Sequence, residues 1–184
     1  MDVFAHAAWT NVVFYKKYRL DKINRLVAVV FGLLPDLLSF VPVFIYQFFE
    51  KKDFMELIGS GAWPVRFASE SYNYTHSVVV FTIIFLAVFV YRFLKKGQYG
   101  QRIYKRAVYY PLFGWLLHIL IDIPTHRDFY ETPFLFPFSD YKFGHGISWA
   151  TPWFMIANYS ALALSYLIWL LIIRKRQKKI VVIK

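Results

Sequence analysis

Three side chains able to bind a metal or to transfer protons stand four residues apart near the end of an apolar stretch, namely His118, Asp122 and His126. On a helix, residues four apart share one face, so His118 and Asp122 can point at one spot. Two imidazoles and a carboxylate at this spacing form the type of chelate that binds a zinc-like ion. A hydrogen-bonded His–Asp pair that locks two helices is the metal-free alternative. Pro124 disturbs the helix before His126, which we therefore expect to be an additional ligand, a proton relay or a loop residue.

Further groups with the same chemistry lie in or beside apolar stretches: His6, Asp36 and His76. Such groups are costly within a membrane unless they are paired, ligated or functional, so we expect them to meet in one cavity. Pro35 removes a backbone donor next to Asp36, which predicts a kink, a break or two short helices there, lining a polar cavity. Thr75 or Ser77 is expected to cap a following helix and so to hold His76 at its start.

The composition is that of an integral membrane protein. Of the 184 residues, 58% are hydrophobic, and several apolar runs approach the length needed to cross a bilayer. The absence of cysteine excludes disulfides and thiolate metal sites, so a transition-metal site must use His, Asp and Glu. We therefore expect one integral membrane domain over residues 1–184.

The apolar pattern predicts an all-α fold, a polytopic membrane bundle of four to five helices. Four stretches are expected to be membrane helices, and a shorter N-terminal helix precedes them: Ile23–Phe49, Ser77–Leu94, Ala107–Ile123, Pro152–Ile173 and the N-terminal Val3–Tyr15. Because the opening residues lack the basic start of a signal peptide, we expect the N-terminal helix to belong to the mature protein. A long aromatic outer loop over residues 129–149 is expected to act as a lid or as a belt at the membrane surface.

The net charge of +11 is concentrated in three basic clusters, which hold most of the 22 Lys and Arg residues: Lys16–Arg25, Arg92–Arg106 and Arg174–Lys184. The positive-inside rule puts these clusters, and with them the C-terminus, on the cytoplasmic side of the inner membrane. All five histidines then fall toward the extracytoplasmic side. The clusters contain a single acid, Asp21, and topology and contact with anionic lipids explain their charge. Membrane lipids are therefore expected partners, and nucleic acid is not.

We predict a divalent metal ion, zinc or alternatively manganese, bound by residues from separate stretches of the chain: His6, Asp36, His76, His118 and Asp122. Metal-bound water has a lowered pKa, which makes hydrolysis the reaction that follows most directly. In that reaction Asp36 is expected to be a ligand or the general base, and His126 a proton relay. Gly114 lies one turn before His118 on the same face, so another backbone is expected to approach closely there.

Several of these motifs resemble those of the YdjM-like inner-membrane metal-dependent hydrolases: Gly32-Leu-Leu-Pro-Asp36, Tyr74-Thr-His-Ser77, His118-x-x-x-Asp122-x-x-Thr-His126 and Phe136-Pro-Phe-Ser139. The resemblance covers most of the chain. It implies a metal-dependent hydrolase whose site residues fall on His6, Asp36, His76, His118 and Asp122. Where many members of that family carry His-Arg-Gly ahead of Thr-His-Ser, this chain has Ser71-Tyr-Asn73, so one His and one Arg are missing.

The expected substrate is a lipid or a lipid-linked ester or phosphoester reached from the outer leaflet. Two alternatives give the same residues a role without catalysis: an ion or proton relay, as in a transporter, or a structural metal that staples short helices together. No inverted repeat is evident in the sequence, which counts against a transporter.

Overall fold

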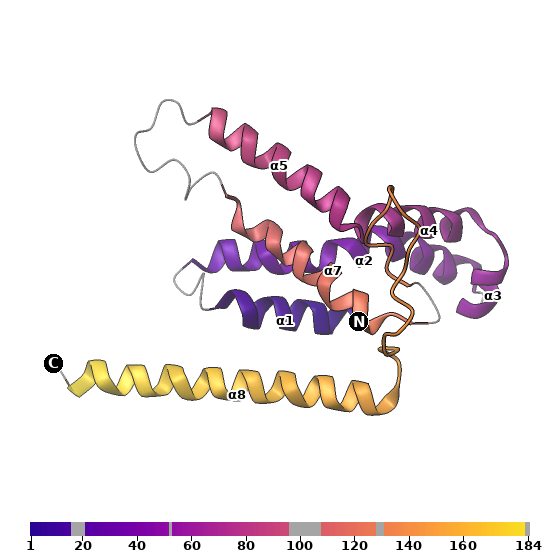
Figure 1. The fold of residues 1–184 in the computed structure, drawn as a ribbon. Helices are drawn as coiled ribbons and strands as arrows, with labels where there is room; N and C mark the ends of the chain where they lie inside the picture. Colours follow the sequence, from indigo (N-terminus) through magenta and orange to yellow (C-terminus); the bar gives the residue numbers. More distant parts are fainter. Residues whose placement is uncertain (16–20, 52, 96–107, 128–130, 183–184) are drawn as a thin grey trace.

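The computed structural model of the chain describes residues 1–15, 21–51, 53–95, 108–127 and 131–182, and every regular element within these ranges is a helix. The elements follow one another as shown in Figure 1: α1 (Val3–Tyr15), α2 (Lys22–Glu50), α3 (Phe54–Gly59), α4 (Trp63–Thr75), α5 (Val78–Leu94), the 3-10 turn η1 (Tyr110–Leu112), α7 (Phe113–Thr125) and α8 (Pro152–Val182). The predicted all-helical class is confirmed for the described residues. The predicted N-terminal helix has the same bounds as α1.

Two helices, α2 and the segment Pro152–Arg174 of α8, are long and apolar enough to cross a membrane. Helices α4 and α5 are bent by 62° relative to each other and together form a third candidate span. By contrast, the 13 residues of α7 cover only about 20 Å, less than the roughly 30 Å of a hydrocarbon core. Length and composition thus support two or three crossing helices among the described residues, where the sequence predicted four.

The predicted break at Pro35 is wrong, because α2 runs without interruption through both Pro35 and Pro42. Pro35 is buried in the helix packing. In apolar surroundings a broken helix exposes backbone groups that nothing can satisfy, and this cost exceeds the local effect of one missing donor. The neighbouring helices therefore keep α2 continuous past Asp36.

Other boundaries also differ from those predicted. No helix was predicted between α2 and α5, but this segment forms α3 and α4. The sequence of α4 is polar, so a search for apolar runs does not find it, although Pro64 in its first turn is a typical helix start. Helix α7 begins at Phe113 after η1, later than the predicted Ala107, which lies outside the described residues, and α8 continues past Ile173 to Val182.

The described residues of the three predicted basic clusters lie at one end of the molecule. They lie at the start of α2, at the end of α5 and toward the end of α8, which all point to the left in Figure 1: Lys22, Arg25, Arg92, Lys95 and Arg174. Much of the predicted clusters Lys16–Arg25 and Arg92–Arg106 lies outside the described residues. The described residues of the three clusters thus share one end, whereas Lys51, Arg66, Arg127 and Lys142 lie in other parts of the molecule. A shared end for the clusters is what a topology signal requires.

Two glycines allow α2 to lie close against α7 and α1. A Cβ atom added at Gly114 of α7 would lie 2.0 Å from the carbonyl oxygen of Ala28 in α2, which confirms the predicted close approach. A Cβ atom added at Gly32 of α2 would lie 2.4 Å from Oγ1 of Thr10 in α1. Small residues at such crossings let backbones meet, and they set the depth at which the polar side chains of the three helices face one another.

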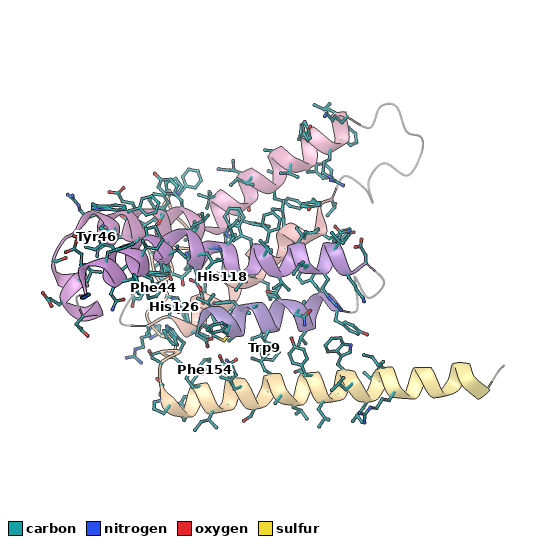
Figure 2. The ribbon with its side chains drawn as sticks, turned by 180° about the vertical axis from the view of Figure 1, so that it is seen from behind. Trp9, Phe44, Tyr46, His118, His126 and Phe154 are labelled. Carbon is teal, nitrogen blue, oxygen red and sulfur yellow. The ribbon has the colours of Figure 1, made fainter. Side chains whose placement is uncertain are left out.

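Helix α8 lies alongside α1 and presents most of its surface outward (Figure 1). Trp9 Nε1 donates to Asn158 Oδ1 at 2.8 Å, and the rings of Trp9 and Phe154 belong to the small apolar cluster between the two helices (Figure 2). Only 11% of the apolar segment of α8 is buried, and large apolar side chains such as Ile83 and Ile168 are exposed on α5 and α8. An apolar surface of this extent is typical of contact with lipid.

The described part of the aromatic loop joins the start of α5 to the end of α7. Ser77 accepts hydrogen bonds from the backbone of Val79 and Val80, which confirms it as the cap of α5, and its hydroxyl donates to the carbonyl of Phe136. Farther along the loop, the backbone N–H groups of Ile147 and Trp149 donate to the carbonyls of Pro124 and Thr125, both at 2.8 Å. The loop thus satisfies polar backbone groups at two helix ends beside the buried histidines.

Candidate metal centre

Four buried side chains from separate elements converge inside the molecule. Asp36 comes from the middle of α2, His76 from the residue that ends α4, and His118 and Asp122 from one face of α7. Each offers one ligand atom, and the four atoms all lie within 4.8 Å of one another. Figure 2 labels His118 and His126 in the interior of the molecule, whereas Trp9 lies on the side of α1 that faces α8. The group can hold a metal ion.

Five of the six separations among the four ligand atoms are close to those of a tetrahedral site. Nε2 of His118 lies 3.0 Å from Nε2 of His76 and 3.0 Å from Oδ2 of Asp122. His76 Nε2 lies 3.4 Å from Asp122 Oδ2 and 3.6 Å from Asp36 Oδ1, and His118 Nε2 lies 3.7 Å from Asp36 Oδ1. At zinc bond lengths of about 2.0–2.1 Å, the corners of a tetrahedron are about 3.3 Å apart. Two nitrogens and two oxygens at these positions fit such an ion.

Hydrogen bonds on the far sides of the rings fix which nitrogens carry protons. His118 Nδ1 lies 2.7 Å from the carbonyl oxygen of Gly32, which can only accept, so Nδ1 carries the proton. His76 Nδ1 lies 2.9 Å from Oγ1 of Thr75, whose hydroxyl donates to the carbonyl of Ser71 at 2.9 Å and therefore accepts from the ring. In the neutral form of both rings, Nε2 is then the unprotonated nitrogen, and it faces the centre.

The four ligand atoms are thus electron-pair donors, and the nearby positive group, the amino group of Met1, contacts the other oxygen of Asp122, Oδ1. Two imidazole lone pairs meet the carboxylates of Asp36 and Asp122, and the buried Oδ2 of Asp122 has no hydrogen-bond partner among the described residues. Such an arrangement is repulsive in a low-dielectric interior. A single shared proton would satisfy one pair of these atoms, whereas a divalent cation at the centre satisfies all four. Backbone and hydroxyl acceptors behind both rings are the usual support of metal-binding histidines.

His6 flanks this group from α1. Its ring stacks on that of His118 with 3.7 Å between ring centroids, and its Nε2 lies 2.9 Å from Asp122 Oδ1. The ring is fully buried, and neither of its nitrogens forms a hydrogen bond with any described residue. His6 therefore faces the opposite oxygen of Asp122 from the one that His76 and His118 face.

His126 follows the end of α7 and completes the surroundings of Asp122. Its Nδ1 is hydrogen-bonded to the hydroxyl of Tyr72 at 2.7 Å, and its Nε2 lies 3.5 Å from Asp122 Oδ1 and 2.6 Å from the amino group of Met1. That amino group also contacts Asp122 Oδ1. Burial lowers the pKa of His126 to about 4, so its ring is neutral at pH 7 and one of its nitrogens is an acceptor.

The structure brings every predicted site residue into one cluster: His6, Asp36, His76, His118, Asp122 and His126. The remaining histidine, His145, is exposed in the loop. Sequence reasoning missed Tyr72, whose ring also stacks on that of His76 at 3.7 Å. The four-residue spacing between Tyr72 and His76 was a usable signal for it. No sequence pattern indicated the contact made by the amino group of Met1.

Comparisons with protein-family models, with curated proteins and with solved structures gave no match. The assignment of the site therefore depends on the geometry and chemistry of this chain.

Proposed function

We propose that the protein is a membrane-embedded hydrolase that depends on a divalent metal ion, zinc or alternatively manganese. One observation carries this proposal, namely the meeting of two imidazole lone pairs and two carboxylates in one buried space with the separations of a tetrahedron. Asp36, His76, His118 and Asp122 would hold the ion. Such an ion, when bound, lowers the pKa of water and polarises a carbonyl or phosphoryl oxygen.

Two residues are suited to handle protons beside the ion. Asp36 and His126 are 5% and 8% exposed, whereas the side chains of His76, His118 and Asp122 are fully buried, so water or substrate arrives first at Asp36 and His126. Asp36 acts as the general base or stays a ligand, and the neutral ring of His126 passes a proton onward. The hydroxyl of Tyr72 orients that ring.

We propose a lipid or a lipid-linked ester or phosphoester as the substrate, reached from the extracytoplasmic side of the inner membrane. The broad apolar surface of α2, α5 and α8 supports contact with lipid. The basic helix ends support an orientation with the C-terminus in the cytoplasm. The motifs shared with the YdjM-like inner-membrane hydrolases favour the same chemistry, and we propose membership of that family.

Metal content tests the central step. We expect purified wild-type protein to carry a divalent ion by elemental analysis, and His118→Ala and Asp122→Asn to lose it. His145→Ala is the matched control, since that histidine is exposed, and it should keep the ion. Wild-type protein without metal, or a His118→Ala protein with unchanged metal content and stability, would contradict the proposal.

Hydrolysis is tested separately on a panel of phospholipids and lipid-linked phosphates in mixed micelles. We expect product release that disappears in His118→Ala and in Asp36→Asn and that persists in His145→Ala. Metal without turnover on any substrate would favour a structural ion. Metal-dependent proton or ion flux in vesicles, again without turnover, would favour the relay.

The proposed membrane orientation can be tested by labelling single introduced cysteines, because the chain has no cysteine of its own. Asp140 is exposed in the aromatic loop, and Lys95 is exposed at the end of α5. An impermeant maleimide should label Asp140→Cys in intact cells or spheroplasts and Lys95→Cys only after permeabilisation, while the cysteine-free parent stays unlabelled. The reverse pattern would place the candidate site on the cytoplasmic side.

A further inference from the structure

The two oxygens of the Asp122 carboxylate face different groups of ligands. Oδ2 faces His76 and His118 at 3.4 and 3.0 Å. Oδ1 faces Nε2 of His6 at 2.9 Å and Nε2 of His126 at 3.5 Å. Two imidazoles thus lie beside each oxygen, and only the Oδ2 side belongs to the four-atom group already assigned to a metal.

The surroundings of Asp122 Oδ1 are those of a site that binds a cation. The ring of His6 is fully buried and its nitrogens make no hydrogen bond with a described residue, although Nε2 is aimed at Oδ1. A positive group, the amino group of Met1, lies between Oδ1 and His126 in this structure. A buried histidine without hydrogen bonds next to a carboxylate and a cation indicates that positive charge is favoured there.

We propose that the protein binds a second divalent cation at this position, held by His6 Nε2, His126 Nε2 and Asp122 Oδ1, so that Asp122 bridges two ions. The inference rests on the proposed function, because a bridge requires the first ion. The incoming ion takes the place of the Met1 ammonium group as the positive charge beside Oδ1. A carboxylate that binds through both oxygens separates two ions by about 3.5–4 Å, the spacing of two-metal hydrolytic sites.

The two metal positions should differ in affinity. The first has four protein ligands, whereas the second has three and must displace the amino group of Met1. We therefore expect stepwise binding, with the first ion tighter. Tyr72 orients His126 from behind through its hydroxyl, so it supports the second ion and is a positioning residue. Removal of such a contact typically weakens a metal about 10- to 100-fold.

Metal stoichiometry distinguishes this proposal from a single-ion site. Metal-free protein in detergent is titrated with Zn²⁺ or Mn²⁺, and bound ion is counted after gel filtration. We expect two ions per chain in wild type and in His145→Ala, and one in His6→Ala and His126→Ala. Tyr72→Phe keeps the ring that stacks on His76, and it should weaken only the second ion, by about 10- to 100-fold.

Electron paramagnetic resonance of the Mn²⁺ form gives a second readout. Two ions bridged by one carboxylate couple magnetically, so wild type should show a broad coupled spectrum and His126→Ala the sharp six-line spectrum of an isolated ion. One ion in wild type, unchanged in His126→Ala and Tyr72→Phe, would overturn the second site and leave the first intact, with the Met1 ammonium as the permanent cation. Wild type with no ion would instead remove the proposed function itself.

Discussion

The crossing of α7 over α2 at Gly114 gives the sharpest test of how the helices position the site. In Gly114→Ala, the new Cβ atom would lie 2.0 Å from the Ala28 carbonyl oxygen and 3.2 Å from the backbone nitrogen of Gly32. Both are backbone atoms of a continuous helix and cannot rotate away as a side chain would. The strain can be relieved only if α7 moves away from α2.

The required movement can be estimated from the contact distances. Real Cβ atoms approach other heavy atoms no closer than about 3.0 Å, so α7 must shift by about 1 Å. His118 lies one turn farther along, and its bond to the Gly32 carbonyl would lengthen from 2.7 Å to about 3.7 Å, beyond hydrogen-bond range. Overpacking of this kind costs about 1–3 kcal/mol, which corresponds to metal binding weakened about 5- to 150-fold.

The assay is a Zn²⁺ or Mn²⁺ titration of metal-free protein in detergent, with circular dichroism to confirm that helix content is kept. Gly59→Ala is the matched control, since no described atom lies within 4 Å of a Cβ atom at that position and metal affinity should not change. A folded Gly114→Ala protein with wild-type metal affinity would refute the view that this helix crossing sets the ligand geometry.

Two further substitutions test single hydrogen bonds near the site. Thr75→Val removes the acceptor behind His76 and should weaken metal binding about 10- to 100-fold in the same titration. Thr82→Val, on the exposed side of α5, is the control and should have no effect. Equal metal affinities of Thr75→Val and wild type would contradict the tautomer assigned to His76. Ser77→Ala removes the cap of α5 and should lower the unfolding free energy by about 1 kcal/mol in thermal unfolding. Ser165→Ala, in α8, is the control and should leave the stability unchanged. Unchanged stability of Ser77→Ala would mean that the loop alone satisfies the backbone N–H groups at the start of α5.

The residues that form the site could be predicted from the sequence. Which of the histidines face each oxygen of Asp122 could not. Ionisable groups in apolar stretches are rare and costly, so His118, Asp122 and Asp36 stood out without any structure. Which oxygen of Asp122 faces which imidazole depends on the rotation and depth of three helices. The close contacts at Gly32 and Gly114 set that geometry, and only the second was anticipated.

The fold, too, could be predicted only in part. Apolar runs bounded by charged residues located α1, α2 and α5 almost to the residue. Helix α4 was not predicted because it packs through few apolar side chains. One of them, Ala68, forms a cluster with Val43 of α2 and Leu57 of α3. The expectation of a break at Pro35 was wrong because the local preference of proline was considered without the helices that pack on either side of α2.

The aromatic loop fastens to the chain directly beside two of the proposed ligands. It is tied to Ser77 and Val78, which follow His76, and to Pro124 and Thr125, which precede His126. Metal occupancy and loop order are therefore linked, since an ion that holds these histidines also holds both anchor points. By the reciprocity of such linkage, filling the site should slow hydrogen exchange of the amide protons of Val78, Ile147 and Trp149, and opening the loop should speed release of the metal.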